Sequence, residues 1–290
     1  AMTTETFVAG AGSWELVAQL DPVTAFLLLV QPVLSDEARR AQVKGDLRTL
    51  ATLLHDSFWR DGFFWGSTGK IGTFRSNHTD FGHILKSYWA LMQIDKRLDD
   101  HPLRQFLADN ASRTLTMAYD TPLGRWAKLP TSATAVENGS DWWAYAEGDQ
   151  LAATLALHDP AWIEKLGLTT THFRADYVDR TRPARELVSS VSRGGVWVYK
   201  WGDGDTSKCN QWKNGFHSTE HALVMSLVSS WAQGVPLELY FAFPAAKVAA
   251  LAAATWPYTF PGRVVGWEDL GPLAGDASRH KVKVRFDQLR

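Results

Sequence analysis

Cysteine is almost absent from this sequence of 290 residues, in which Cys209 is the single example. One cysteine cannot form an internal disulfide, and there is no cysteine pair for a zinc ribbon. A reducing compartment suits such a chain, and we therefore expect a cytoplasmic protein.

An excess of either charge is also absent. Thirty basic side chains face 31 acidic ones, which leaves a formal net charge of -1. No cluster of Lys and Arg with interleaved aromatic residues occurs along the chain. We therefore expect no nucleic-acid partner.

Long apolar runs are missing as well. The most apolar stretch, "VTAFLLLVQPVL", covers residues 23–34 and contains Pro32. A membrane-spanning helix needs about 20 apolar residues. The N-terminus lacks the charged start and apolar centre of a signal peptide. We expect no membrane segment.

Tryptophan is abundant, with 14 residues, and 45% of the chain is hydrophobic, which suffices for an ordinary packed core. The tryptophans have two interpretations. They fill the core, or their indole faces line a cleft in which sugar rings stack and the indole N–H groups donate to hydroxyls.

Helical patterns dominate the sequence. The pattern over residues 21–34 predicts an apolar helix with Asp21 as cap and Pro22 at its first position. Residues 35–59 predict another helix, with Ser35 as N-cap. The glycine-rich, aromatic stretch 60–75 predicts an irregular hairpin. Three helix pairs follow, at 79–98 with 101–120, 140–159 with 160–179, and 217–234 with 244–256.

Connections of alternating length organise these helices. The links within pairs are a few residues long, whereas residues 121–139 and 189–215 form long loops rich in glycine and aromatic residues. Helical hairpins joined by long loops at one end predict an all-α fold, an α/α toroid. Residues 263–290 alternate apolar and basic side chains and predict a C-terminal β-hairpin. We expect a single domain over residues 1–290.

Three of these helices begin with polar and aromatic residues. The motifs are "NHTDFGHILKSYW", "DWWAYAEGDQ" and "GFHSTEHALV". The three- and four-residue spacing places the polar side chains of each motif on one helix face. A lone histidine is more often a hydrogen-bonded core residue, but three polar faces in phase favour one shared site. The members of these faces are His83, Lys86 and Ser87; Trp143, Glu147 and Gln150; His217, Glu220 and His221.

The motifs "DFGHILKSYWAL", "WWAYAEG" and "WKNGFHSTEHAL" resemble the three signature regions of the N-acylglucosamine 2-epimerase superfamily, in the same order. This family includes cellobiose and mannose 2-epimerases and mannose isomerases. The resemblance covers residues 21–231. It implies an (α/α)6 barrel that moves a proton next to a sugar carbonyl, with neither a metal nor an organic cofactor.

Motif matching also implies the roles of individual residues. His83 and His217 match the two family histidines that act as general acid and base, and Glu147 matches the acid that organises the site. Trp142 and Trp143 match its aromatic wall. The expected substrate-binding residues, with a small-molecule sugar as partner, are Trp142, Trp143, Lys86, Glu220, Trp89, Arg75 and Trp212.

The residue types suit this chemistry independently of the resemblance. The C1 carbonyl of an open-chain aldose acidifies the C2 proton, and imidazole titrates near the operating pH. Epimerisation needs one group on each face of a planar enediolate, and a cation such as Lys86 or Arg75 stabilises the oxyanion. Isomerisation to a ketose uses the same enediolate.

Two departures from the family pattern stand out. Lys86 occupies a position where the epimerases have an acid, and Glu220 one where they have arginine, so we predict a contact between these two side chains. Only 82 residues precede His83, fewer than in the family. The chain is then the later part of a longer polypeptide, a shortened toroid completed by a partner chain or a second copy, or a protein that has lost the activity.

Other functions stay open. The H-x-x-E-H spacing suits a zinc peptidase with His217 and His221 as ligands and Glu220 as base, although no third ligand lies in a clear helical pattern downstream. A carbohydrate hydrolase or lyase would pair Asp80 or Asp141 with Glu147. A non-catalytic sugar-binding protein on the same fold is the third alternative.

Overall fold

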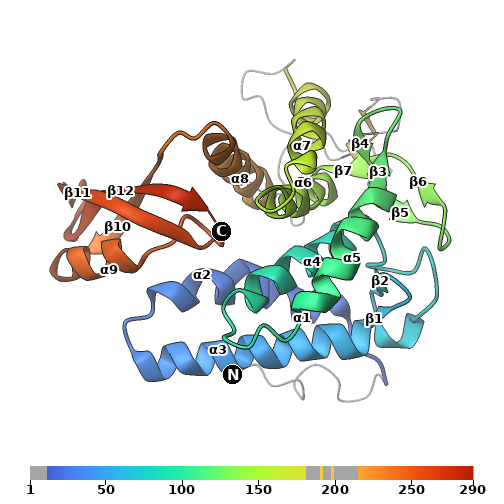
Figure 1. Cartoon of the computed structure of the whole chain (residues 1–290), viewed down its shortest axis with the longest axis horizontal. Helices are drawn as coiled ribbons and strands as arrows, with labels where there is room; N and C mark the ends of the chain where they lie inside the picture. The colour runs from blue at the N-terminus through green and yellow to red at the C-terminus, as the bar shows by residue number, and fades with distance from the viewer. Residues whose placement is uncertain (1–11, 181–189, 192–196, 199–214, 290) are drawn as a thin grey trace.

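The computed structural model describes residues 12–180, 190–191, 197–198 and 215–289, and the described part is mostly helical (Figure 1). The helices are α1 (Leu16–Pro22), η2 (Val23–Leu27), α2 (Leu28–Val30), η3 (Gln31–Val33), α3 (Glu37–Leu53), η4 (Leu54–Phe58), η5 (Thr68–Lys70), α4 (Phe81–Asp95), α5 (Arg104–Ala118), α6 (Trp142–Ala156), α7 (Ala161–His172), η6 (Phe173–Tyr177), α8 (Phe216–Ala232), η7 (Ala245–Lys247) and α9 (Val248–Ala254).

Short strands accompany the loops between these helices. The predicted hairpin in 60–75 is present as β1 (Trp59–Arg60) paired with β2 (Phe63–Phe64). The other short strands form antiparallel ladders that contact α4, α5, α6 and α7. They are β3 (Tyr119–Asp120) with β4 (Arg125–Trp126), β5 (Leu129–Pro130) with β6 (Val136–Glu137), and β7 (Ser140–Asp141) with β8 (Ser190–Val191) and β9 (Trp197–Val198).

Inner and outer helices alternate in the centre of the molecule. Helices α4 and α6 are buried along nearly their whole length, whereas α5 and α7 bury one side only. Helix α4 packs on α6 and α6 packs on α8, so the three predicted motif helices lie next to one another (Figure 1). The first two predicted helix pairs are present as α4 with α5 and α6 with α7.

The third predicted pair is wrong. Strand β10 (Leu237–Pro244) follows α8, and α8 packs on β10 and β12 rather than pairing with α9. The predicted hairpin is confirmed as β11 (Gly262–Leu273) with β12 (Asp276–Leu289), and β12 lies between β10 and β11 in a three-stranded antiparallel sheet. The fold is therefore mostly helical with a C-terminal sheet, not all-α.

The N-terminal helix begins earlier than predicted. Asp21 and Pro22 lie at the C-terminal end of α1, and Asp36 rather than Ser35 caps α3 by accepting from Arg39 N. Residues 16–33 are helical throughout and are long and apolar enough, by length and composition, to cross a membrane. One face of this segment packs into the core, where Leu16, Leu20 and Val23 are fully buried.

Candidate functional site

Glu147 is the centre of a buried polar cluster between α4, α6 and α8. Its side chain is 2% exposed. Trp89 Nε1 donates to Glu147 Oε2 over 2.7 Å, and His217 Nδ1 and Lys86 Nζ lie 3.3 and 3.9 Å from Glu147 Oε1. Around Glu147 of α6, helix α4 therefore contributes Trp89 and Lys86, and α8 contributes His217.

Lys86 is the cation of this cluster and connects it to α1. Its ammonium group donates to Asp21 Oδ1 over 2.8 Å. Burial works to lower the pKa of Lys86, but the carboxylates of Glu147 and Asp21 outweigh burial and raise it. Lys86 therefore stays charged, as a buried cation with anionic partners does.

The two carboxyl groups of the cluster have pKa values pushed in opposite directions. Burial works to raise the pKa of Glu147, but Lys86, His217 and the Trp89 hydrogen bond outweigh it and hold this pKa below its usual value. Burial, together with the charge of Glu147, raises the pKa of Glu220 to about 7. Separated pKa values of this kind supply one ionised and one protonated carboxyl near neutral pH.

His83 and His217 both lie next to the indole of Trp143. His83 Nδ1 is 2.8 Å from Asp80 Oδ2, and Asp80 also accepts from His83 N as the N-cap of α4. An Nδ1–H held by a carboxylate leaves Nε2 as the basic nitrogen. The Trp143 ring lies 4.7 Å from the His83 ring and 6.0 Å from the His217 ring, between centroids.

Gly82 leaves room for the side chain of Trp143. A Cβ atom at Gly82 would lie 2.4 Å from Cζ3 of Trp143, which is far inside van der Waals contact. Glycine before His83 therefore lets the indole from α6 lie directly against α4, next to both histidines.

Tyr258 is a member of the site that the sequence did not predict. It lies between α9 and β11 with φ of 66°, and its hydroxyl donates a short hydrogen bond to Glu220 Oε1. Burial, and then the charge of Glu220, raise the pKa of Tyr258, so the phenol keeps its proton. Its setting between Pro257 and Pro261 was the one available signal, because prolines fix the path of a short segment.

His221 contacts a different carboxylate, that of Asp149. Its Nε2 is 2.6 Å from Asp149 Oδ2, and Asp149 Oδ1 accepts from Trp126 Nε1 and Thr169 Oγ1 over 2.8 and 2.5 Å. His221 and His217 therefore do not converge on one ion, and the zinc-peptidase interpretation of H-x-x-E-H is wrong. Asp149 is fully buried, so this network belongs to the core.

A different set of residues could hold a metal ion. Among the residues that the structure describes, one such group exists: ligand atoms of Glu147, His217 and Glu220 lie within 4.8 Å of one another. The ammonium group of Lys86, 3.9 Å from Glu147 Oε1, already supplies a positive charge there and opposes a second cation.

The remaining predicted residues lie as follows. Arg75 is exposed and pairs with Glu137 over 2.6 Å, so it does not contribute to the cluster. Trp89 is fully buried and presents no face to a substrate, and Trp142 is also buried. Trp212 lies outside the described residues.

The predicted contact between Lys86 and Glu220 is wrong as a direct ion pair. Lys86 pairs with Asp21 and Glu147, and Glu220 bonds to Tyr258. The charge of Glu220 still helps to raise the pKa of Lys86. The exchanged charges are thus linked through Glu147 rather than directly.

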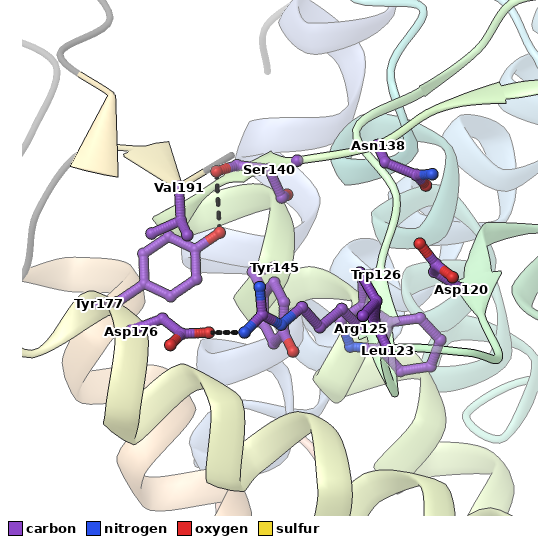
Figure 2. Close-up of a pocket in the computed structure, with 11 residues that line it drawn as sticks. Asp120, Leu123, Arg125, Trp126, Asn138, Ser140, Tyr145, Asp176, Tyr177 and Val191 are labelled. Carbon is purple, nitrogen blue, oxygen red and sulfur yellow. Dashed lines mark hydrogen bonds and ion pairs between the residues drawn. The ribbon is translucent and has the colours of Figure 1, made fainter. Parts of the chain in front are cut away.

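A cavity next to this region is a packing feature (Figure 2). It has a volume of about 10 Å³, room for about one water molecule. Arg125 crosses it to pair with Asp176 over 2.8 Å, and Tyr177 donates to the carbonyl of Ser140 over 2.8 Å. It is too small for a sugar.

Comparison with solved structures places this geometry in a known fold. The chain is similar to a cellobiose 2-epimerase from Bacillus thermoamylovorans B4167, with a TM-score of 0.58 and 15% identity over 79% of this chain. A sugar epimerase from a ruminal bacterium has a TM-score of 0.57 and 16% identity over 74% of this chain. A cellobiose 2-epimerase from Spirochaeta thermophila DSM 6192 has a TM-score of 0.58 and 16% identity over 75%.

The fold is that of the sugar 2-epimerases. The resemblance predicted from the three motifs is confirmed at this level. The chain spans just over half the length of these structures, namely 56%, 54% and 53% of them. No protein-family model and no curated protein sequence matches it.

Proposed function

We propose that this protein is a sugar 2-epimerase or aldose-ketose isomerase that moves a proton at C2 of an open-chain sugar. The observation that supports it most is the pair of imidazoles that both lie next to Trp143, one beside Asp80 and the other beside Glu147. Epimerisation needs a proton acceptor and a proton donor on opposite faces of one carbon.

The cluster suggests how the residues divide the work. His217 and His83 exchange the proton at C2, and Glu147 and Asp80 orient their rings and stabilise the imidazolium forms. Lys86 keeps Glu147 ionised. Protonated Glu220, held by Tyr258, donates a hydrogen bond to the developing enediolate oxygen, in place of the arginine of the epimerase pattern.

The architecture that goes with this function is a shortened (α/α)6-type toroid formed as one catalytic domain. Helices α4, α6 and α8 are its inner helices, and α5 and α7 lie outside them. We propose that a further segment or a partner chain completes the ring, that the protein acts in the cytoplasm, and that it uses no cofactor.

Solvent exchange tests the proposed activity directly. The purified protein is incubated in heavy water with a panel of free and phosphorylated aldoses and β-linked disaccharides, and deuterium at C2 is followed by NMR. We expect incorporation at C2 together with a new epimer or ketose. Absence of exchange across the whole panel would contradict the proposal.

A retaining glycoside hydrolase is the second candidate, because the site holds two carboxyl groups with separated pKa values. Ligand oxygens of Glu147 and Glu220 lie within 4.8 Å of each other, close to the carboxyl spacing of about 5 Å in such enzymes. Glu220 would be the acid and Glu147 the nucleophile. Release of reducing ends from oligosaccharides, without deuterium at C2, would favour this candidate.

A further inference from the structure

A second polar region lies away from the Glu147 cluster, between α3, the C-terminal end of α4 and the segment after α9 (Figure 1). It is a pocket of about 470 Å³, the size range of small-molecule sites. Four cationic side chains and one carboxylate line it. The lining residues are Gln31, Glu37, Arg40, Ala41, Lys44, Lys96, Arg97 and Trp256.

Among the residues that the structure describes, the two inner cations, Lys96 and Arg97, have no anionic partner. Lys96 Nζ is buried and makes no hydrogen bond with any residue in the described part of the chain. Arg97 is 6% exposed, and its guanidinium donates to the carbonyls of Gln93, Leu28 and Thr259, which carry no charge. Arg97 Nε is buried and lacks a hydrogen-bond acceptor within those described ranges.

Carboxylates nearby serve other cations. Lys44 pairs with Asp99 over 2.7 Å, and Arg48, on the same helix, pairs with Asp100 over 2.6 Å. Glu37, the one acid that lines the pocket, is exposed in the first turn of α3. Within the described residues these carboxylates therefore pair with Lys44 and Arg48, and neither Lys96 nor Arg97 has an ion pair.

Unpaired buried cations are costly, and their pKa values reflect this. Burial, and then the neighbouring charge of Arg97, lower the pKa of Lys96 to about 8. Burial also lowers the pKa of Arg97, whose guanidinium stays charged at neutral pH. The C-terminal dipole of α4 offsets part of this cost but supplies no acceptor for Lys96 Nζ or Arg97 Nε.

We propose that this pocket binds a phosphate group, either as inorganic phosphate or as the phosphate of a small ester. A dianion placed between Lys96 and Arg97 would accept hydrogen bonds from Nζ and Nε, the two donors without acceptors. Arg40 lies at the same pocket and adds a third cation. Trp256, whose ring lies 4.5 Å from Arg97 Cζ, offers an aromatic edge to an esterified sugar or base.

Lys96→Met is the sharpest variant for a test. Lys96 Nζ makes no hydrogen bond within the described chain, so the substitution removes a desolvated charge and no such contact. We expect the variant to fold with an unchanged or higher melting temperature without phosphate. Lys70→Met, at an exposed lysine outside the pocket, is the control with the same change of charge.

Calorimetric titration and thermal melting with inorganic phosphate, against sodium chloride of equal ionic strength, measure the binding. Phosphate should raise the melting temperature of the wild type and of Lys70→Met, as a ligand of the native state does. Lys96→Met should bind at least about tenfold more weakly, the order expected for one charged hydrogen bond. Arg40→Gln, whose side chain is half-buried, should also weaken binding and serves if Lys96→Met fails to fold.

Parallel titrations with a sugar phosphate and a nucleoside monophosphate distinguish a free anion from an ester. Tighter binding of an ester, with the same loss in Lys96→Met, identifies the ester as the ligand. Equal binding of all three identifies the phosphate group alone. An unchanged melting temperature in phosphate, or equal phosphate affinity of wild type and Lys96→Met, would overturn the proposal, whatever the outcome of the deuterium test.

Discussion

Helices α6 and α8 form two histidine–carboxylate pairs, in which the histidines lie about one turn apart on α8 and the carboxylates lie two residues apart on α6. His217 with Glu147 is the upper pair, and His221 with Asp149 is the lower pair. The upper nitrogen and oxygen are 3.3 Å apart and the His217 side chain is 20% exposed, whereas the lower atoms are 2.6 Å apart and the His221 side chain is 5% exposed.

The two pairs differ in how many of their polar atoms have a hydrogen-bond partner. Asp149 accepts from Trp126, Thr169 and His221, and the His221 ring packs on Phe173 at 4.0 Å between centroids. In the upper pair, His217 Nδ1 and Glu147 Oε1 have an ionic neighbour but no hydrogen bond of good geometry within the described chain. The same residue types therefore form a fixed core contact at one level and groups available for a ligand at the next.

Replacing the upper histidine should give the largest effect. We expect His217→Asn to lower the rate of C2 deuterium exchange by about 100- to 10,000-fold, the usual contribution of a general base. Unfolding in urea should change by less than about 1 kcal/mol, because His217 makes no hydrogen bond of good geometry within the described residues. A rate equal to that of the wild type would assign the proton transfer elsewhere.

Replacing the lower carboxylate should act on stability. Asp149→Asn leaves a buried histidine without its anion and disturbs the bonds from Trp126 and Thr169, so we expect a loss of about 3–5 kcal/mol in urea unfolding. Asp99→Asn, which breaks an exposed pair with Lys44, is the control and should cost about 0–1 kcal/mol. Equal losses in the two variants would remove the distinction between the two levels.

The comparison also separates what the sequence predicts from what it cannot. Helical periodicity fixes which side chains share a face, and from it we predicted that the polar faces of three helices converge; Lys86, Glu147 and His217 do meet there. The spacing H-x-x-E-H alone suits both His217 and His221, the family resemblance assigned proton transfer to His217, and the contact of His221 with buried Asp149 supports a structural role for His221. Asp21 and Tyr258 contact the cluster from segments that are distant in the sequence. Such long-range contacts could not be predicted from a single sequence.

In the C-terminal region, too, the sequence predicted local structure but not a contact between distant segments. The hairpin formed by β11 and β12 follows from alternation along each strand, which is a local property. Strand β10 was missed between two helical patterns, although Leu237 and Phe243 are buried at its ends. Its pairing with β12 joins residues more than 30 positions apart, so it depends on tertiary structure.

Near each of the two histidine–carboxylate pairs, a glycine lies against an indole. These two contacts provide a third test of the comparison. A Cβ atom at Gly82 would meet Trp143 at 2.4 Å, and one at Gly148 would meet Trp126 at 2.8 Å. Alanine at either position should destabilise the protein by about 1–3 kcal/mol through overpacking. Only Gly82→Ala should slow deuterium exchange out of proportion to its loss of stability, because Trp143 lies next to both proposed catalytic rings.

Gly45 supplies the matched control for these two glycines. It lies within α3, and a Cβ atom there meets nothing within 4 Å. Gly45→Ala should therefore stabilise the protein by about 0.5–1 kcal/mol through its higher helix propensity. Destabilisation by Gly45→Ala in urea would show that alanine is unfavourable even where its Cβ meets nothing. Contact with an indole would then not be what distinguishes the three positions.

The smallest expected effect concerns the proton on Glu220. Its pKa in the folded protein, about 7, exceeds the ordinary value of 4.5, so folding takes up a proton between these pH values. This group therefore stabilises the fold relatively more below pH 4.5, and that contribution is lost as the pH rises through 7. Glu220→Gln should flatten the decline of stability with pH in this window, as measured by urea unfolding at pH 5 and 7.5.

Tyr258→Phe should move the same titration in a defined direction. The hydrogen bond from Tyr258 lowers the pKa of Glu220, so its removal should raise that pKa further above 7. A ¹³C NMR titration of the glutamate carboxyl groups, assigned through Glu220→Gln, measures the shift. Tyr240→Phe, at an exposed tyrosine of β10, is the control and should leave the Glu220 signal unchanged. A downward shift in Tyr258→Phe would show that this phenol stabilises the protonated carboxyl of Glu220 instead, and the direction assigned to the Tyr258 hydrogen bond would be wrong.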